Sequence, residues 1–126
     1  MAIHSFDLEK GLSVGGVVNK HVVLRELTAG DLIDAMAESE RVVMVPTKDG
    51  AEPRLVLSDS LMGINCLRRQ VKTLGDMAGP LDIDVLRQLS AEDLNLLQKG
   101  VEDMEKAIYM ELVAQGRAEP ARTDDQ

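Results

Sequence analysis

The sequence predicts an α+β fold: one domain in which an N-terminal antiparallel β-hairpin packs against three to four α-helices. Apolar and polar residues alternate through the first 27 positions, as in a half-buried strand, whereas apolar residues in the second half recur at helical spacings of three and four. The length of 126 residues and the hydrophobic share of 44% suit one ordinary core. We expect this domain over residues 1–115. Residues 116–126 are polar and lack large apolar side chains, which predicts a disordered tail.

The N-terminal hairpin has two possible registers. A three-residue loop, residues 14–16, matches apolar with apolar residues across the strands but sets Lys10 opposite Lys20. A two-residue Gly15-Gly16 turn avoids these like charges but gives a poorer apolar match. The first register pairs Phe6 with Leu24, Leu8 with Val22 and Leu12 with Val18; the second pairs Leu8 with Val23 and Leu12 with Asn19.

A helix of about three turns is expected after the hairpin. Thr28 is a favourable N-cap, Asp31 suits the positive end of the helix, and Leu32, Ile33 and Met36 lie on one side of it. The next segment, 42–57, has two short β-prone runs around a stretch of turn formers. It predicts either a second short hairpin or a long exposed loop.

Three further helices are expected in the second half of the chain. Ser58 or Ser60 begins the first, which Gly75 ends, and Pro80 begins a short one. Ser90, with Asp93 three residues on, caps the longest, which ends at Gly116. The apolar stripe of the first of these helices consists of Leu61, Ile64, Leu67, Val71 and Leu74.

The charge balance limits the classes of partner. Fourteen basic and twenty-two acidic residues give a net charge of −8, the wrong sign for gripping nucleic acid or an anionic membrane. Cys66 is the only cysteine, so no intrachain disulfide forms, and the N-terminus has neither the basic start nor the apolar stretch of a signal peptide. These features favour a cytosolic protein that binds neither nucleic acid nor membrane.

The sequence gives no indication of catalytic, cofactor-binding or metal-binding residues. His4, His21 and Cys66 are scattered over different elements, and metal sites need several ligands at helical or turn spacing. The Gly15-Gly16 pair lacks the downstream residues of a phosphate-binding loop. We therefore expect no enzyme and no cofactor.

Two charged clusters have a functional and a structural interpretation. Asp31, Asp34 and Glu38 recur at helical spacing, and a solvated helix face is favoured over paired catalytic acids. The basic cluster could receive an acidic partner helix, although a solvated face is again favoured; it consists of Arg68, Arg69 and Lys72.

The longest helix carries the candidate protein-binding site. Its apolar stripe alternates spacings of three and four, close to the heptad seam with which helices pair. The alternative is that the centre of the stripe covers the hairpin and the second helix. Further apolar residues, among them Tyr109 and Met110, lie off the stripe, so something more is expected to be covered there. The candidate site residues are Leu94, Leu97, Val101, Met104 and Ile108.

Two stretches give the chain a family resemblance. They are Leu24-Arg25-Glu26-Leu27-Thr28-Ala29-Gly30-Asp31-Leu32 and Leu86-Arg87-Gln88-Leu89-Ser90-Ala91-Glu92-Asp93-Leu94. Together with a β start and a helical C-terminal half, they resemble the tail assembly chaperones of Mu-like and P2-like bacteriophages. The resemblance extends over most of residues 6–113.

This resemblance implies a protein of the bacterial host cytoplasm that is absent from the mature virion. It would bind the phage tape measure protein and keep it soluble during tail morphogenesis, with the tail tube protein as a second candidate partner. Several copies would coat one tape measure, so a homo-oligomer is expected. The alternatives are a structural tail component and a small regulatory protein that binds a host protein.

Overall fold

The structure, a computed structural model, describes residues 4–116 and confirms the α+β fold. Residues 117–126 of the predicted tail lie outside the described residues. The elements, in chain order, are β1 (His4–Val14), β2 (Val17–Leu24), α1 (Ala29–Ser39), β3 (Glu40–Thr47), β4 (Gly50–Leu57), α2 (Asp59–Gln70), β5 (Val71–Leu74), β6 (Met77–Ala78), α3 (Ile83–Leu86) and α4 (Ala91–Ala114).

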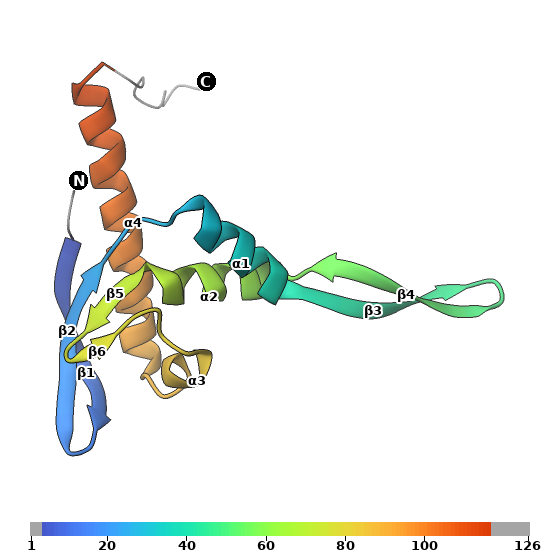
Figure 1. Cartoon of the computed structure of the whole chain (residues 1–126), viewed down its shortest axis with the longest axis horizontal. Coiled ribbons are helices and arrows are strands. Elements are labelled where there is room, and N and C mark those ends of the chain that lie inside the picture. Colours follow the sequence, from blue (N-terminus) through green and yellow to red (C-terminus); the bar gives the residue numbers. More distant parts are fainter. Residues whose placement is uncertain (1–3, 117–126) are drawn as a thin grey trace.

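The body of the molecule is a four-stranded antiparallel sheet with helices packed on it (Figure 1). The strand order is β1-β2-β5-β6, and α4 packs against β1 and β2. Aliphatic side chains from the sheet, α2, α3 and α4 form one core. Its buried members are Leu8, Leu12, Val22, Leu24, Leu67, Val71, Leu74, Leu81, Leu86, Leu97, Val101 and Met104.

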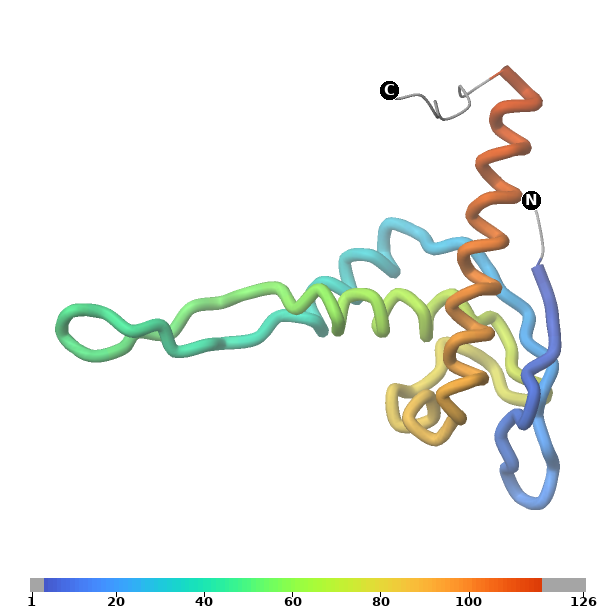
Figure 2. The backbone as a smooth tube through the Cα atoms, turned by 180° about the vertical axis from the view of Figure 1, so that it is seen from behind, coloured from blue at the N-terminus to red at the C-terminus, as the bar shows by residue number. Residues whose placement is uncertain are grey.

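A long excursion leaves the sheet between β2 and β5 and returns to the same place. Leu24 at the end of β2 is the sheet partner of Val71 at the start of β5, and the Arg25 amide donates to the Gln70 carbonyl at 2.8 Å. Between them, α1 runs outward and α2 runs back, packed against each other. Residues 40–57, strands β3 and β4, project beyond these helices as a two-stranded ribbon, here called the arm (Figures 1 and 2).

The N-terminal hairpin adopts the two-residue turn rather than the three-residue loop. Gly15 and Gly16 both have positive φ, 57° and 82°, which glycine alone adopts readily in such a turn. Leu12 pairs with Asn19, as the second register predicted. The expected Phe6–Leu24 and Leu8–Val22 pairs are wrong, because the register shifts between Asp7 and Leu12 and sets Phe6 opposite Val22.

This shift is a bulge in β1 that the carboxylate of Asp93 holds. The backbone amides of Glu9 and Gly11 donate to it at 2.7 and 2.9 Å, and that of Lys10 at 3.2 Å. Gly11 has φ of 70°, and a Cβ there would collide with the Asn19 carbonyl. Asp93 itself is fully buried near the start of α4, with its amide bonded to the Ser90 hydroxyl, so one side chain joins the helix start to the strand.

The second predicted helix ends earlier than expected. α2 stops at Gln70, and Val71 and Leu74 lie in β5, where both are buried beside β2. Ser58 is its N-cap, one of the two predicted caps. The short third helix also begins later than Pro80, after its N-cap Asp82.

The predicted capping of α1 at Thr28 is confirmed. The Thr28 hydroxyl accepts from the Asp31 amide, and the Asp31 carboxylate accepts from the Thr28 amide, which is a reciprocal capping box. The Arg25 guanidinium also donates twice to Asp31, at 2.8 and 2.9 Å. These bonds, with Arg25 first, hold the pKa of Asp31 well below its usual range.

Asp93→Asn is expected to lower the free energy of unfolding by about 2–4 kcal/mol. The asparagine side chain has one acceptor oxygen where the carboxylate has two, so backbone N–H groups of the β1 bulge lose their acceptor. Urea denaturation at neutral pH measures the change. The matched control is Glu92→Gln. Glu92 is exposed and forms only a surface ion pair with Lys10 at 3.7 Å, so its change should stay below about 0.5 kcal/mol. Equal losses in both variants would contradict the anchoring role.

Stability is expected to fall steeply below about pH 4, near the unfolded pKa of an aspartate. Burial raises the pKa of Asp93. Hydrogen bonds from the amides of Glu9, Gly11 and Lys10 and with the Ser90 hydroxyl together lower it by more, so the folded pKa lies below the usual value. Asp31 shifts in the same direction. The stabilisation is therefore complete above the unfolded pKa and is lost as the pH falls toward the folded pKa. Urea denaturation at several pH values from 6 to 3 gives the free energy of unfolding at each pH. This free energy should fall less steeply with pH for Asp93→Asn than for the unaltered chain.

Candidate protein-binding surfaces

The predicted binding stripe lies mostly inside the core. Leu97, Val101 and Met104 are buried, with 1%, 8% and 1% of their surface exposed. Leu94 and Ile108 are partly buried and pack at the margin of the same core. The centre of the stripe thus covers the sheet and α2, as its alternative interpretation had it. That these five residues bind another protein stays a prediction.

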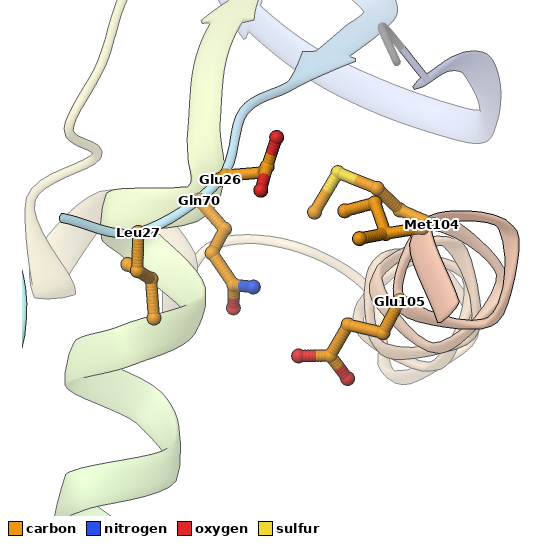
Figure 3. A pocket seen from close by; sticks show the side chains of 6 residues that line it. Glu26, Leu27, Gln70, Met104 and Glu105 are labelled. Carbon is orange, nitrogen blue, oxygen red and sulfur yellow. The ribbon is translucent and has the colours of Figure 1, made fainter. Parts of the chain in front are cut away.

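The C-terminal end of the stripe reaches the surface in a pocket between α4 and the start of the excursion (Figure 3). Met104, Glu105 and Ile108 form its α4 wall. Across from them lie Leu27, from the segment before α1, and Gln70, the last residue of α2, with Glu26 at the rim. The pocket has a volume of about 210 Å³. Its lining is half apolar, from Leu27, Met104 and Ile108, and half polar, with two carboxylates, which suits a segment that carries both apolar and basic side chains.

The projecting half of α4, seen in Figure 1, carries a second apolar surface next to this pocket. Tyr109 and Met110 lie there with Lys106, and Met110 is 59% exposed. Both residues were expected off the stripe, and their position outside the core agrees with that expectation. Glu105 lines both hollows, so the two lie side by side on α4.

Helix α1 turns its large apolar side chains outward. Leu32, Ile33 and Met36 are all exposed, whereas the small residues Ala35 and Ser39 are fully buried. The side toward α2 is made by these small residues because they let two helix backbones approach closely. The spacing of four between Ala35 and Ser39 indicates a helix face of small residues that can pack closely on another helix. The large apolar residues at neighbouring positions made their own side look like the buried one.

The arm exposes six large apolar side chains. It is a hairpin, so of the two alternatives for residues 42–57 the second hairpin is correct and the long exposed loop is wrong. Among its residues only Val45 is partly buried. An isolated two-stranded ribbon is marginally stable in water, so such a surface is typical of a region that another chain covers. The exposed residues are Val42, Val43, Met44, Leu55, Val56 and Leu57.

A polar network fixes the base of the arm. Glu38 of α1 accepts from both Arg68 and Arg69 of α2, each at 2.6 Å. The Ser39 hydroxyl accepts from Asn65 at 2.9 Å, and Arg68 also donates to the Leu81 carbonyl at 2.8 Å. Hydrogen bonding to Arg69 lowers the pKa of Glu38, and the same bond raises the pKa of Arg69.

This network corrects part of the interpretation of two charged clusters as solvated faces, whereas Asp34 and Lys72 are exposed as that interpretation predicts. Arg69 is buried and Arg68 is half-buried, and both bind Glu38 of their own chain rather than solvent or an acidic partner helix. Asp31 binds Arg25 and caps α1. The sequence places these charged residues on two separate helices but does not show that the two helices pack against each other.

The described residues show little material for catalysis. Within residues 4–116 no group of three or more His, Cys, Asp or Glu side chains is placed to hold a metal ion. Burial raises the pKa of the Cys66 thiol, which disfavours the reactive thiolate. In the same part of the chain, no helix combines the length and the apolar character that crossing a bilayer requires.

Glu38→Ala is expected to loosen α1 without unfolding the body, because it leaves the Arg69 guanidinium buried without its carboxylate. Hydrogen exchange of the α1 amides should accelerate on the order of tenfold, with β1 and β2 unchanged. Exposed Glu40, two positions along, provides the control Glu40→Ala. Unchanged exchange in α1, or equal acceleration in the control, would show that the network does not hold the base of the arm.

The chain was compared with known proteins. A family model described as tail assembly protein gp41 matches residues 8–117. Mu-like prophage FluMu protein gp41 of Haemophilus influenzae is 40% identical over 114 residues, which cover 90% of this chain and 87% of that protein. No solved structure matches.

Two proteins of Escherichia phage Mu are also similar. The probable tail assembly proteins gp41 and FS-gp41 are each 45% identical over 91 residues, or 72% of this chain. The matched part covers 60% of the first and 46% of the second, so this chain aligns with less than two thirds of either phage Mu protein.

Proposed function

Because this chain belongs to the tail assembly protein gp41 family of Mu-like phages, we propose that it is a tail assembly chaperone. In this proposal it binds the phage tape measure protein in the cytoplasm of the bacterial host. It keeps that extended protein soluble until the tail tube forms around it and is left out of the mature virion. The tail tube protein is a second candidate partner.

One observation carries the proposal: the chain combines a large exposed apolar surface with a strongly acidic composition. Thirteen large apolar side chains are exposed within residues 4–116, among them Met110 on the projecting half of α4. An apolar surface of this kind fits a partner that must itself be shielded from water. The net charge of −8 keeps the resulting complex soluble.

We assign the client surface to the corner between the segment before α1 and the projecting half of α4. The pocket there joins Leu27 to Met104 and Ile108, and the exposed Met110 extends the apolar surface along α4. A helical client segment fits such a groove by inserting its apolar face. Of the predicted stripe, Met104 and Ile108 are the members that line this corner, whereas Leu97 and Val101 are core residues and unsuitable as probes.

Co-expression with the tape measure protein of the same phage or prophage tests the proposal. We expect the tape measure protein to be insoluble alone and to co-purify in soluble form with this chain. An insoluble client without a complex would refute the chaperone function and favour the structural alternative. Detection of this chain in purified virions would refute it as well.

Ile108→Glu is expected to reduce the co-purified client on the order of tenfold, because it replaces an apolar contact in the pocket by a third negative charge beside Glu26 and Glu105. Ala107→Glu is the matched control. Ala107 is exposed on the adjacent position of α4 and lines neither hollow, so the same added charge should leave binding within about twofold. Circular dichroism establishes that both variants are folded. Equal binding by the two variants would move the client surface away from this corner.

A further inference from the structure

The register of the arm separates its side chains into two unlike faces. Residues paired directly across an antiparallel ribbon lie on the same face. Pairs of Arg41 with Val56, Val43 with Arg54 and Val45 with Glu52 give a mixed face. The other face, here called the apolar face, consists of Val42, Met44, Pro46, Ala51, Pro53, Leu55 and Leu57, with Glu40 at its base.

The apolar face is also the more exposed of the two. Val42, Met44 and Leu55 have 66%, 62% and 64% of their surface exposed, whereas Val43 and Val56 on the mixed face have 39% and 41%. Because these side chains are so exposed, no other element within residues 4–116 covers the face. The arm thus presents to solvent the face that burial would favour most.

Two prolines protect the edges of the arm but not its face. In an antiparallel ribbon, pairs that exchange backbone hydrogen bonds alternate with pairs whose backbone groups point outward. Proline has no N–H to donate, so the pairs of Met44 with Pro53 and Pro46 with Ala51 are of the outward-pointing kind. Pro46 therefore removes an outward donor from the open edge of β3, and Pro53 removes one from the edge of β4. Both edges are poor templates for an added strand, so a partner is expected on the face.

The charge of the arm fits a second copy of the same chain. Glu40, Asp49 and Glu52 balance Arg41, Lys48 and Arg54, so residues 40–57 are neutral, and the net −8 lies entirely on the rest of the chain. Two copies therefore repel each other through their bodies but not through their arms. Self-association at the arm is the arrangement in which apolar surface meets apolar surface while the acidic bodies stay apart.

We propose that the arms of two copies pack apolar face to apolar face, as a two-layer sandwich of four strands around a two-fold axis. The arm projects clear of the body (Figures 1 and 2), so two arms overlap with the bodies at opposite ends. Each strand of eight residues is about 26 Å long, and residues near its middle lie close to the axis. Met44 of one copy then lies near Met44 of the other.

The size of this contact predicts a weak, reversible dimer. One face of a ribbon about 26 Å long offers roughly 250–350 Å² per copy, well below the ~800 Å² of a standard interface. Dimerisation is therefore expected at micromolar to submillimolar concentration of the free chain. Copies gathered on one extended client would meet at a higher local concentration.

Met44→Glu tests the proposal in sedimentation velocity across this concentration range. The unaltered chain should shift from monomer to dimer, and Met44→Glu should weaken the association at least tenfold by placing like charges near the axis. Val43→Glu is the matched control. It makes the same change one residue away on the mixed face, opposite Arg54, and should leave the dimer intact. A chain that stays monomeric throughout, or a dimer that survives Met44→Glu, would overturn the proposal.

Disulfide trapping provides a second measurement that does not depend on added charge. In a Cys66→Ser background, Met44→Cys should form a disulfide-linked dimer under mild oxidation and Val43→Cys should not. Equal trapping at both positions would overturn the face-to-face arrangement. Both experiments use the purified chain alone, so their failure leaves the chaperone proposal standing, and failure of client binding leaves this one standing.

Discussion

The carboxylate of Asp93 fixes the relation between the first strand, β1, and the last helix, α4. Three consecutive amides of the β1 bulge donate to it, so groups that the bulge removes from the strand ladder still find a partner. Because Asp93 lies in the first turn of α4, these bonds also set where the helix begins on the sheet. The burial of Leu97, Val101 and Met104 follows from that placement, and so does the direction in which the second half of α4 leaves the body.

Local chemistry made part of the fold predictable. The helix starts at Thr28, Ser58 and Ser90 depend on contacts within three residues, and the sequence shows all of them. The strand β5 was not predictable in this way. Val71 and Leu74 continue the helical spacing of α2 and also suit a strand, and their pairing with β2 decides between the two. The β1 bulge depends on Asp93, more than 80 residues away in sequence.

The binding surface was only partly predictable for a related reason. A stripe of apolar residues on a helix marks a face to be covered, but it does not distinguish a sheet of the same chain from another protein. In α4 the same chain covers the centre of the stripe, and its two ends, at Leu94 and Ile108, border the surface. In the arm the two β-prone runs form strands, one of the two alternatives left open, yet no second layer lies on them within residues 4–116. Register, rather than hydrophobicity alone, identifies which face is left open.

The excursion from Arg25 to Gln70 has a consequence for how such proteins diversify. Its two ends are joined by a backbone hydrogen bond, and the strands that flank it are neighbours in the sheet. The sheet and α4 therefore close without any contribution from its distal part. Lengthening, shortening or exchanging the arm alters what the molecule presents to its surroundings and leaves the register of the body untouched. The distal part of the excursion, residues 40–57, can therefore change in length or sequence while the sheet, α2 and α4 keep their packing.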